Sequence, residues 1–259
     1  MAPRRVRTAD GIEIACEVEG DGPALVAVHG AGSASWGFAL LRPHLERRFE
    51  VWTVDRRGRG DSGDADGYAL EREVEDVTAV VRAAGEGALL FGHSYGGLLA
   101  GAAAPRLPEL PGLVLYEPPM GGVLGGSERV DRWEALVEAG DRDRMVSEFL
   151  GEIGGYSDHE IEAFRDTPAW ELRKQVAHTV PRELRAELRY ELDRESLGRL
   201  GTRTLLLVGT ESPAWATRST DAYAEAIPGV TVRTLEGHGH GAALSAPELL
   251  AEEIAGFLL

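Results

Sequence analysis

Short, almost wholly apolar runs alternate with longer amphipathic stretches along this chain, and this alternation constrains its fold most strongly. Residues 24–28 and 204–208 are nearly all apolar or β-branched, which is typical of strands that are covered on both faces of a parallel sheet. Residues 70–84 carry valines at helical spacing with acidic residues between them. Strand–helix–strand alternation predicts an α/β fold with a mostly parallel central sheet and right-handed crossovers.

The same pattern sets the expected limits of the individual elements. We expect strands over residues 13–19, 24–29, 49–55, 88–91, 113–117, 204–208 and 231–235. We expect the helices that flank this sheet over residues 38–48, 70–84, 97–107, 219–227 and 247–258.

One long segment interrupts the alternation. More than 80 residues without a clear strand follow Glu117, and a glycine-rich stretch over residues 121–126 opens them. Helical patterns follow at 130–139, 142–153, 159–165, 169–179 and 182–192. Simple connections are far shorter, so we interpret residues 118–200 as a helical cap inserted into an α/β core of residues 1–117 and 201–259. A set of ordinary crossover helices is the alternative.

Composition excludes several classes of protein. The 259 residues include 27 basic and 43 acidic side chains, a net charge of −16, which argues against nucleic acid or an anionic membrane as a partner and against strongly anionic substrates. The single cysteine, Cys16, excludes an intramolecular disulfide. No run approaches a membrane span, and no apolar region follows the basic first residues. We therefore expect a soluble cytoplasmic protein, a monomer or homodimer, that acts on a small molecule.

A serine motif lies at the junction of a predicted strand and a predicted helix. The G-x-S-x-G sequence is Gly92-His93-Ser94-Tyr95-Gly96, with an apolar run before it and small residues after it. In this setting the motif forms a sharp turn that exposes the serine hydroxyl at the carboxyl edge of the sheet. The glycines leave room for a strained backbone, and the N-terminus of the following helix favours negative charge that develops beside the serine.

Three further motifs occur in order at predicted strand ends. They are His29-Gly30-Ala31-Gly32, the turn Asp55-Arg56-Arg57-Gly58-Arg59-Gly60-Asp61-Ser62, and Gly237-His238-Gly239-His240 with Pro247 and a terminal helix after it. Together with the serine motif, they resemble the α/β-hydrolase family over nearly the whole chain. The resemblance implies the α/β-hydrolase fold, a mostly parallel central sheet flanked by helices, with a helical cap insertion.

The resemblance also implies roles for individual residues. Ser94 attacks an acyl carbon, and His240, which the spacing to Pro247 favours over His238, serves as the general base. The backbone N–H groups of Ala31 and Tyr95 form the oxyanion hole. Similar epoxide hydrolases and haloalkane dehalogenases carry an aspartate at the nucleophile position, so the serine favours acyl chemistry.

The acid of the expected triad is ambiguous. The family usually places it in the loop after the strand at 204–208, and the register puts Ser212 there, which cannot stabilise an imidazolium as a carboxylate does. Glu117 lies at the end of the strand next to the nucleophile strand, a position that some haloalkane dehalogenases use for their acid. Glu211 lies one residue away from the usual position. We keep Glu117 and Glu211 as candidates, with the absence of a true acid as a third possibility.

The remaining expectations concern the pocket and the reaction. No cluster of side chains has metal-ligand spacing, and no G-x-G-x-x-G motif opens a nucleotide site, so we expect no metal and no cofactor. Trp36 and Met120 flank the predicted site loops and are expected at the substrate pocket. The sequence predicts a serine hydrolase of small or medium esters or lactones. The alternatives are a C–C bond hydrolase, a lyase or other metabolite-modifying enzyme with the same Ser–His site, and a ligand-binding protein on a hydrolase scaffold.

Overall fold

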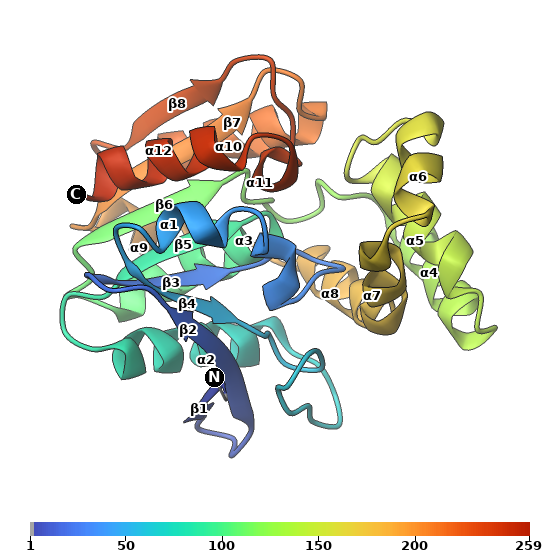
Figure 1. Ribbon diagram of the computed structural model, residues 1–259, viewed down its shortest axis with the longest axis horizontal. Helices are drawn as coiled ribbons and strands as arrows, with labels where there is room; N and C mark the ends of the chain where they lie inside the picture. The colour runs from blue at the N-terminus through green and yellow to red at the C-terminus, as the bar shows by residue number, and fades with distance from the viewer. Residues whose placement is uncertain (1–2) are drawn as a thin grey trace.

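An eight-stranded sheet runs through the centre of the computed structural model, which describes residues 3–259 (Figure 1). The strand order is β1-β2-β4-β3-β5-β6-β7-β8. The strands are β1 (Arg4–Arg7), β2 (Glu13–Glu19), β3 (Ala24–Val28), β4 (Glu50–Val54), β5 (Leu89–His93), β6 (Gly112–Tyr116), β7 (Arg203–Gly209) and β8 (Thr231–Leu235). β1 and β2 pair antiparallel, as do β2 and β4, and all the other neighbours are parallel. The predicted α/β fold with a mostly parallel sheet is confirmed.

Alternate side chains of the central strands build two cores, one on each face of the sheet. Val26, Leu90 and Leu206 belong to a cluster with α2 (Leu70–Ala84), α3 (Tyr95–Ala103) and α10 (Ala214–Ala226). The neighbouring strand residues, including Leu25 and Leu205, pack on the other face. There they meet α1 (Arg42–Leu45) and α12 (Pro247–Leu258). Burial on both faces explains why these strands are apolar at consecutive positions.

A group of helices is inserted between β6 and β7. They are α4 (Ser127–Glu138), α5 (Arg142–Glu152), α6 (Asp158–Arg165), α7 (Pro168–Val176), α8 (Thr179–Glu187) and α9 (Arg194–Gly198). Figure 1 shows α4 to α8 grouped beyond the carboxyl ends of the parallel strands. These five helices share a hydrophobic cluster that includes Trp133, Met145 and Trp170, whereas Leu197 of α9 packs on the sheet. The division into a core and a cap remains a prediction.

Buried ion pairs join the inserted helices to the sheet. Glu183 of α8 accepts hydrogen bonds from Arg56, at 2.7 Å, and from Arg59, both in the loop after β4. Arg56 also donates through Nε to Glu73 of α2, at 3.0 Å. All four side chains are almost fully buried. Two guanidinium groups and two carboxylates therefore form one enclosed cluster, which we call the Arg56 cluster.

Most predicted elements lie close to their expected limits, and the exceptions have local causes. The prediction of one helix over 38–48 is wrong, because the chain forms the short 3-10 helix η1 (Ser35–Phe38) and then α1. Pro43 lies in the first turn of α1, and a proline there cannot continue a helix from the residues before it. β1 was not expected, because an exposed edge strand of mostly arginine carries no apolar pattern. No helix formed by the described residues combines the length and apolarity that a membrane crossing requires.

Candidate active site

Ser94 occupies the sharp turn between β5 and α3. Its φ and ψ angles are 54° and −127°, a region that non-glycine residues rarely adopt. The flanking glycines permit this turn. A Cβ atom on Gly96 would lie 2.2 Å from the Val28 carbonyl oxygen, and a Cβ atom on Gly92 would lie 2.4 Å from the Gly96 carbonyl oxygen. The motif glycines are therefore required for close backbone packing around the serine.

A second strained residue lies beside Ser94. Glu117 has a φ of 47°, and it and Ser94 are the only non-glycine residues with positive φ among residues 3–259. The parallel register of β5 and β6 pairs His93 with Tyr116. Ser94 and Glu117 thus follow adjacent strands at the same level of the carboxyl edge. Backbone strain of this kind is retained where the surrounding structure requires a particular side-chain position.

The Glu117 carboxylate is in contact with His240. Oε2 lies 2.5 Å from His240 Nδ1, and Oε1 accepts hydrogen bonds from the Gly209 N–H, at 2.8 Å, and from the Ser212 hydroxyl. Glu117 is fully buried and His240 is 9% exposed. A carboxylate that accepts the Nδ1 proton leaves the lone pair of Nε2 free, which is the form of imidazole that can take a proton.

The other acid candidate lies outside this arrangement. Glu211 is an exposed residue whose backbone N–H donates to the His238 carbonyl oxygen at 2.9 Å. Ser212 stands where the family usually has its acid, and its hydroxyl donates to Glu117 instead. Of the two candidate carboxylates, the structure brings only Glu117 into contact with His240.

His93 supports the loop that carries His240. Its Nε2 lies 3.0 Å from the His240 carbonyl oxygen, and since a carbonyl only accepts, Nε2 donates. The His93 ring stacks on Tyr116, with centroids 4.9 Å apart. Burial lowers the pKa of His93 well below its ordinary value, so the ring is neutral near pH 7 and carries its single proton on Nε2.

The loop after β3 holds one peptide group in a defined direction. The Gly30 carbonyl oxygen accepts hydrogen bonds from His29 Nδ1, at 2.8 Å, and from Arg56 Nη1, at 3.2 Å. In a trans peptide the carbonyl and the next N–H point in opposite directions. The two donors therefore fix the direction of the Ala31 N–H, and Ala31 lines the cavity that contains Ser94. Burial, followed by the charges of Arg56 and Arg59, lowers the pKa of His29 and keeps it neutral.

Tyr95 supplies a second free amide. It is the first residue of α3, so its N–H has no acceptor within the helix. Its ring is buried beneath the Arg56 guanidinium, 4.7 Å from the ring centroid. The Arg56 cluster thus contacts both peptide segments that the sequence assigns to the oxyanion hole.

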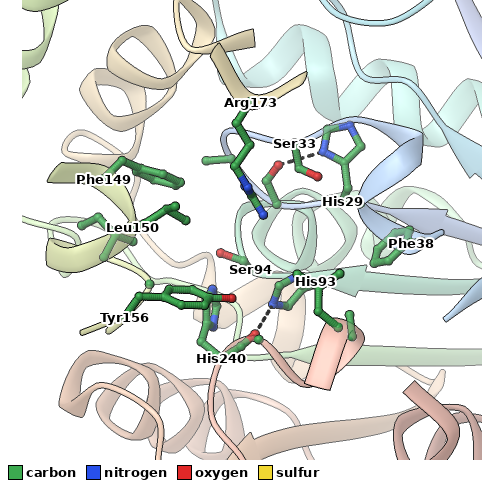
Figure 2. Close-up of a pocket in the computed structure, with 18 residues that line it drawn as sticks. His29, Ser33, Phe38, His93, Ser94, Phe149, Leu150, Tyr156, Arg173 and His240 are labelled. Atoms are coloured by element: carbon green, nitrogen blue, oxygen red, sulfur yellow. Dashed lines mark hydrogen bonds between the residues drawn. The ribbon is translucent and has the colours of Figure 1, made fainter. Parts of the chain in front are cut away.

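Ser94 and His240 line the same cavity, which has a volume of about 70 Å³ (Figure 2). Its walls come from the loop after β3, the β5–α3 turn, α5, α7 and the loop around His240. The side chains contributed by the inserted helices and the turn after α5 are Phe149, Leu150, Ile153, Tyr156 and Arg173. A more open groove of about 660 Å³ adjoins the cavity and shares Tyr156 and His240 with it.

The two residues expected at the substrate pocket do not line this cavity. Met120 packs with the cluster on the α2–α3 face of the sheet, and its N–H donates to Ser219 at 3.0 Å. Trp36 lies behind Arg173, with its ring centroid 5.4 Å from the guanidinium carbon. Arg173 was not predicted at the cavity, because an arginine in an amphipathic helical pattern carries no sign that it points inward.

A serine on a strand-to-helix turn, in one cavity with a histidine that contacts a buried carboxylate, is the arrangement around which α/β hydrolases are built. The chain belongs to the alpha/beta hydrolase family, whose model matches residues 25–253. The family resemblance in the sequence is confirmed, and the protein is an α/β-hydrolase enzyme.

Individual relatives agree with this assignment. The chain is 30% identical to the pimeloyl-[acyl-carrier protein] methyl ester esterase of Xanthomonas oryzae pv. oryzae, over 93% of this chain and 97% of the relative. It is 31% identical to the uncharacterized hydrolase YraK of Bacillus subtilis, but that match spans less than half of either chain, 46% and 45%. The crystal structure of an alpha/beta hydrolase from Sphaerobacter thermophilus superimposes with a TM-score of 0.86 at 34% identity and covers 99% of this chain and 100% of the other.

Proposed function

We propose that this protein is a cofactor-free serine hydrolase that cleaves small carboxylic esters or lactones through an acyl-enzyme at Ser94. The observation that carries the proposal is the fully buried Glu117 carboxylate 2.5 Å from His240 Nδ1. This contact leaves His240 Nε2 as the free base of a cavity that also holds Ser94. The methyl ester esterase named among the relatives supports an ester as the substrate class.

The proposed reaction proceeds in two steps. His240 takes the Ser94 proton as Oγ attacks the carbonyl carbon, and the Ala31 and Tyr95 N–H groups stabilise the oxyanion. His240 then returns the proton to the leaving alcohol as the C–O bond breaks. Water attacks the acyl-enzyme by the same route, releases the acid and restores Ser94. Residues 118–200 form a cap that encloses the acyl group, over a core of residues 1–117 and 201–259.

The test is covalent labelling with a fluorophosphonate probe, followed by intact mass and peptide mapping. We expect single labelling at Ser94 in the wild-type protein, no labelling of Ser94→Ala and far slower labelling of His240→Ala. Ser245→Ala and His238→Ala are matched controls, since these residues lie along the adjoining groove, and both should label at the wild-type rate. The rates at which these variants hydrolyse a panel of short esters and lactones should rank them in the same order.

Two outcomes would contradict the proposal. A folded wild-type protein that remains unlabelled lacks an activated nucleophile. Equal labelling of the wild-type and His240→Ala proteins would show that His240 is not the base.

A further inference from the structure

Arg173 of α7 extends into the cavity toward Ser94 (Figure 2). Its Nη1 donates to the Gly32 carbonyl oxygen at 2.8 Å. Its Nε is buried and has no hydrogen-bond partner among the described residues. A guanidinium has five N–H donors, so most of its hydrogen-bonding capacity is unused.

No carboxylate of residues 3–259 forms an ion pair with Arg173. The rings of Trp36 and Phe164 lie 5.4 Å from the guanidinium carbon. These aromatic faces stabilise a cation to a modest degree, but they carry no net negative charge. Burial accordingly lowers the pKa of Arg173 below its ordinary value.

Arg173 is partly buried, and the three fully buried arginines of this chain have different surroundings. Arg56 and Arg59 each contact Glu73 and Glu183, and Arg57 contacts Asp10 and Asp76. This agrees with the general rule that buried charges are paired, because an unpaired one is costly to remove from water. Arg173 also places a guanidinium N–H out of contact with water, at Nε, but no carboxylate of the described residues pairs with it.

The cavity walls supply no compensating charge. The residues that line it include no aspartate and no glutamate. The titratable side chains that face Arg173 are His93, His29, His240 and Tyr156. Burial lowers the pKa of His29 and of His93 and raises the pKa of Tyr156, so these three are neutral near pH 7. A negative charge opposite Arg173 must therefore come from a ligand.

We propose that Arg173 binds a carboxylate group of the substrate, so that the enzyme acts on short acyl compounds that carry a carboxylate beside the ester or lactone group. This inference rests on the proposed hydrolase function and specifies its substrate class. The planar fork of a guanidinium matches a carboxylate with two parallel hydrogen bonds. The volume of about 70 Å³ places the carboxylate only a few carbon atoms from the reacting carbonyl.

The first experiment measures binding without catalysis. The Ser94→Ala protein is titrated calorimetrically with succinate and with succinamide, which is neutral and of equal size. We expect succinate to bind at least about 10-fold more tightly. Equal affinities, or no binding of succinate, would overturn the proposal. This arm needs no substitution of Arg173 and does not depend on hydrolysis, so it remains decisive even if Arg173 variants fail to fold.

The second experiment assigns the preference to Arg173. Adding Arg173→Gln to the Ser94→Ala protein should abolish the preference for succinate, and Arg173→Lys should retain part of it. Lys174→Gln is the matched control, since Lys174 lies next to Arg173 on α7 and pairs with Glu171 on the surface. A preference that survives Arg173→Gln would place the carboxylate elsewhere.

The third experiment measures hydrolysis of monomethyl succinate and of methyl 4-oxopentanoate, its neutral isostere. Arg173→Gln should lower kcat/KM for the charged ester on the order of 100-fold more than it lowers kcat/KM for the neutral ester. Equal losses on both esters would mean that Arg173 only links α7 to the loop at Gly32. Failure of the wild-type enzyme on both esters would contradict the hydrolase function, while the binding arm would still decide whether a carboxylate is held.

Discussion

The contact between Glu117 and His240 shows which of the two candidate carboxylates reaches the histidine, a point that the residue pattern left open. Glu117 and Glu211 both follow strands of the sheet, and a sequence contains no information on which strand end reaches His240. The β6–β7 register, which pairs Tyr116 with Leu207, brings Glu117 to the Gly209 N–H. Ser212 then donates to the carboxylate. The backbone strain at Glu117 is likewise invisible in the residue types, whereas the strain at Ser94 was predictable from its flanking glycines.

We predict that Glu117→Gln lowers kcat by roughly 10³ to 10⁴, whereas Glu211→Gln leaves it within about twofold. A glutamine amide at Glu117 cannot stabilise the imidazolium and can donate toward Nδ1, which favours the wrong tautomer. Steady-state rates on a short ester, with circular dichroism to verify folding, provide the measurement. Small and equal effects in the two variants would contradict the role of Glu117.

At the scale of elements, the Arg56 cluster links α8 to the loop after β4 through buried ion pairs. We predict that Glu183→Gln lowers the free energy of unfolding by about 3–5 kcal/mol, because it leaves the buried Arg56 and Arg59 with one carboxylate between them. The comparison is Asp64→Asn, which removes the more exposed pair between Asp64 and Arg182 of α8 and should cost less than about 1 kcal/mol. Urea unfolding measures the free energy of unfolding of each variant, and similar losses in the two variants would contradict the prediction.

Glu187, the last residue of α8, introduces a pH dependence of stability. Its Oε1 accepts the Val123 N–H at 3.1 Å, but burial raises its pKa from 4.5 to about 7. The folded protein therefore binds this proton more tightly than the unfolded chain, and the associated stability is present below pH 4.5 and lost as the pH rises to about 7.

Glu187→Gln removes this titration while keeping an acceptor for Val123. We predict that the variant gains stability relative to the wild-type protein as the pH rises, by up to about 3 kcal/mol. Urea unfolding below pH 4.5 and above pH 7 provides the measurement, with the exposed Glu191→Gln as control. A difference between Glu187→Gln and the wild-type protein that does not change with pH would contradict the prediction.

Elements with strong local signals were predicted best. β2, β8, α2 and α12 begin and end at the predicted residues, because a glycine or proline lies within two residues of at least one end of each. The helix expected from residue 219 begins at Ala214 instead, because Pro213 precedes the helix and its first turn packs Trp215 against the inserted helices. The length of the insertion was predictable, because the sequence shows a long segment without a strand pattern. The Arg173 side chain points from α7 into the cavity. This direction depends on packing between distant segments, which no local sequence pattern contains.

At the scale of the whole molecule, net charge and site charge differ in sign. The chain carries −16, which led us to expect no strongly anionic substrate. Surface charges act through solvent and are screened beyond about 8–10 Å. A carboxylate bound as proposed would contact Arg173 inside a cavity of about 70 Å³, where an ion pair is far less screened. The overall charge therefore describes solubility and says little about the ligand.

Cys16 provides a test of how the whole sheet unfolds. It lies on β2 and is fully buried, and burial together with the charge of Asp55 raises its pKa to about 12. We predict that iodoacetamide alkylates the native protein far more slowly than the denatured one, because the thiolate is both inaccessible and scarce. Mass spectrometry over time measures the rate. Labelling at similar rates in both states would mean that the β1–β2 edge opens independently of the rest.

Ser94 and Glu117 follow the adjacent strands β5 and β6, so the spacing of the sheet, not the inserted helices, sets the distance between them. In the proposed function, the sheet therefore sets the reactivity, and the side chains of α4 to α6 contribute to the selectivity. Exchange of residues 127–165, which span α4 to α6 and leave Glu183 and the Arg56 cluster in place, for the matching segment of another family member should leave a competent acylation centre with a different substrate range. This offers a route by which one duplicated gene acquires a new substrate while its chemistry stays intact.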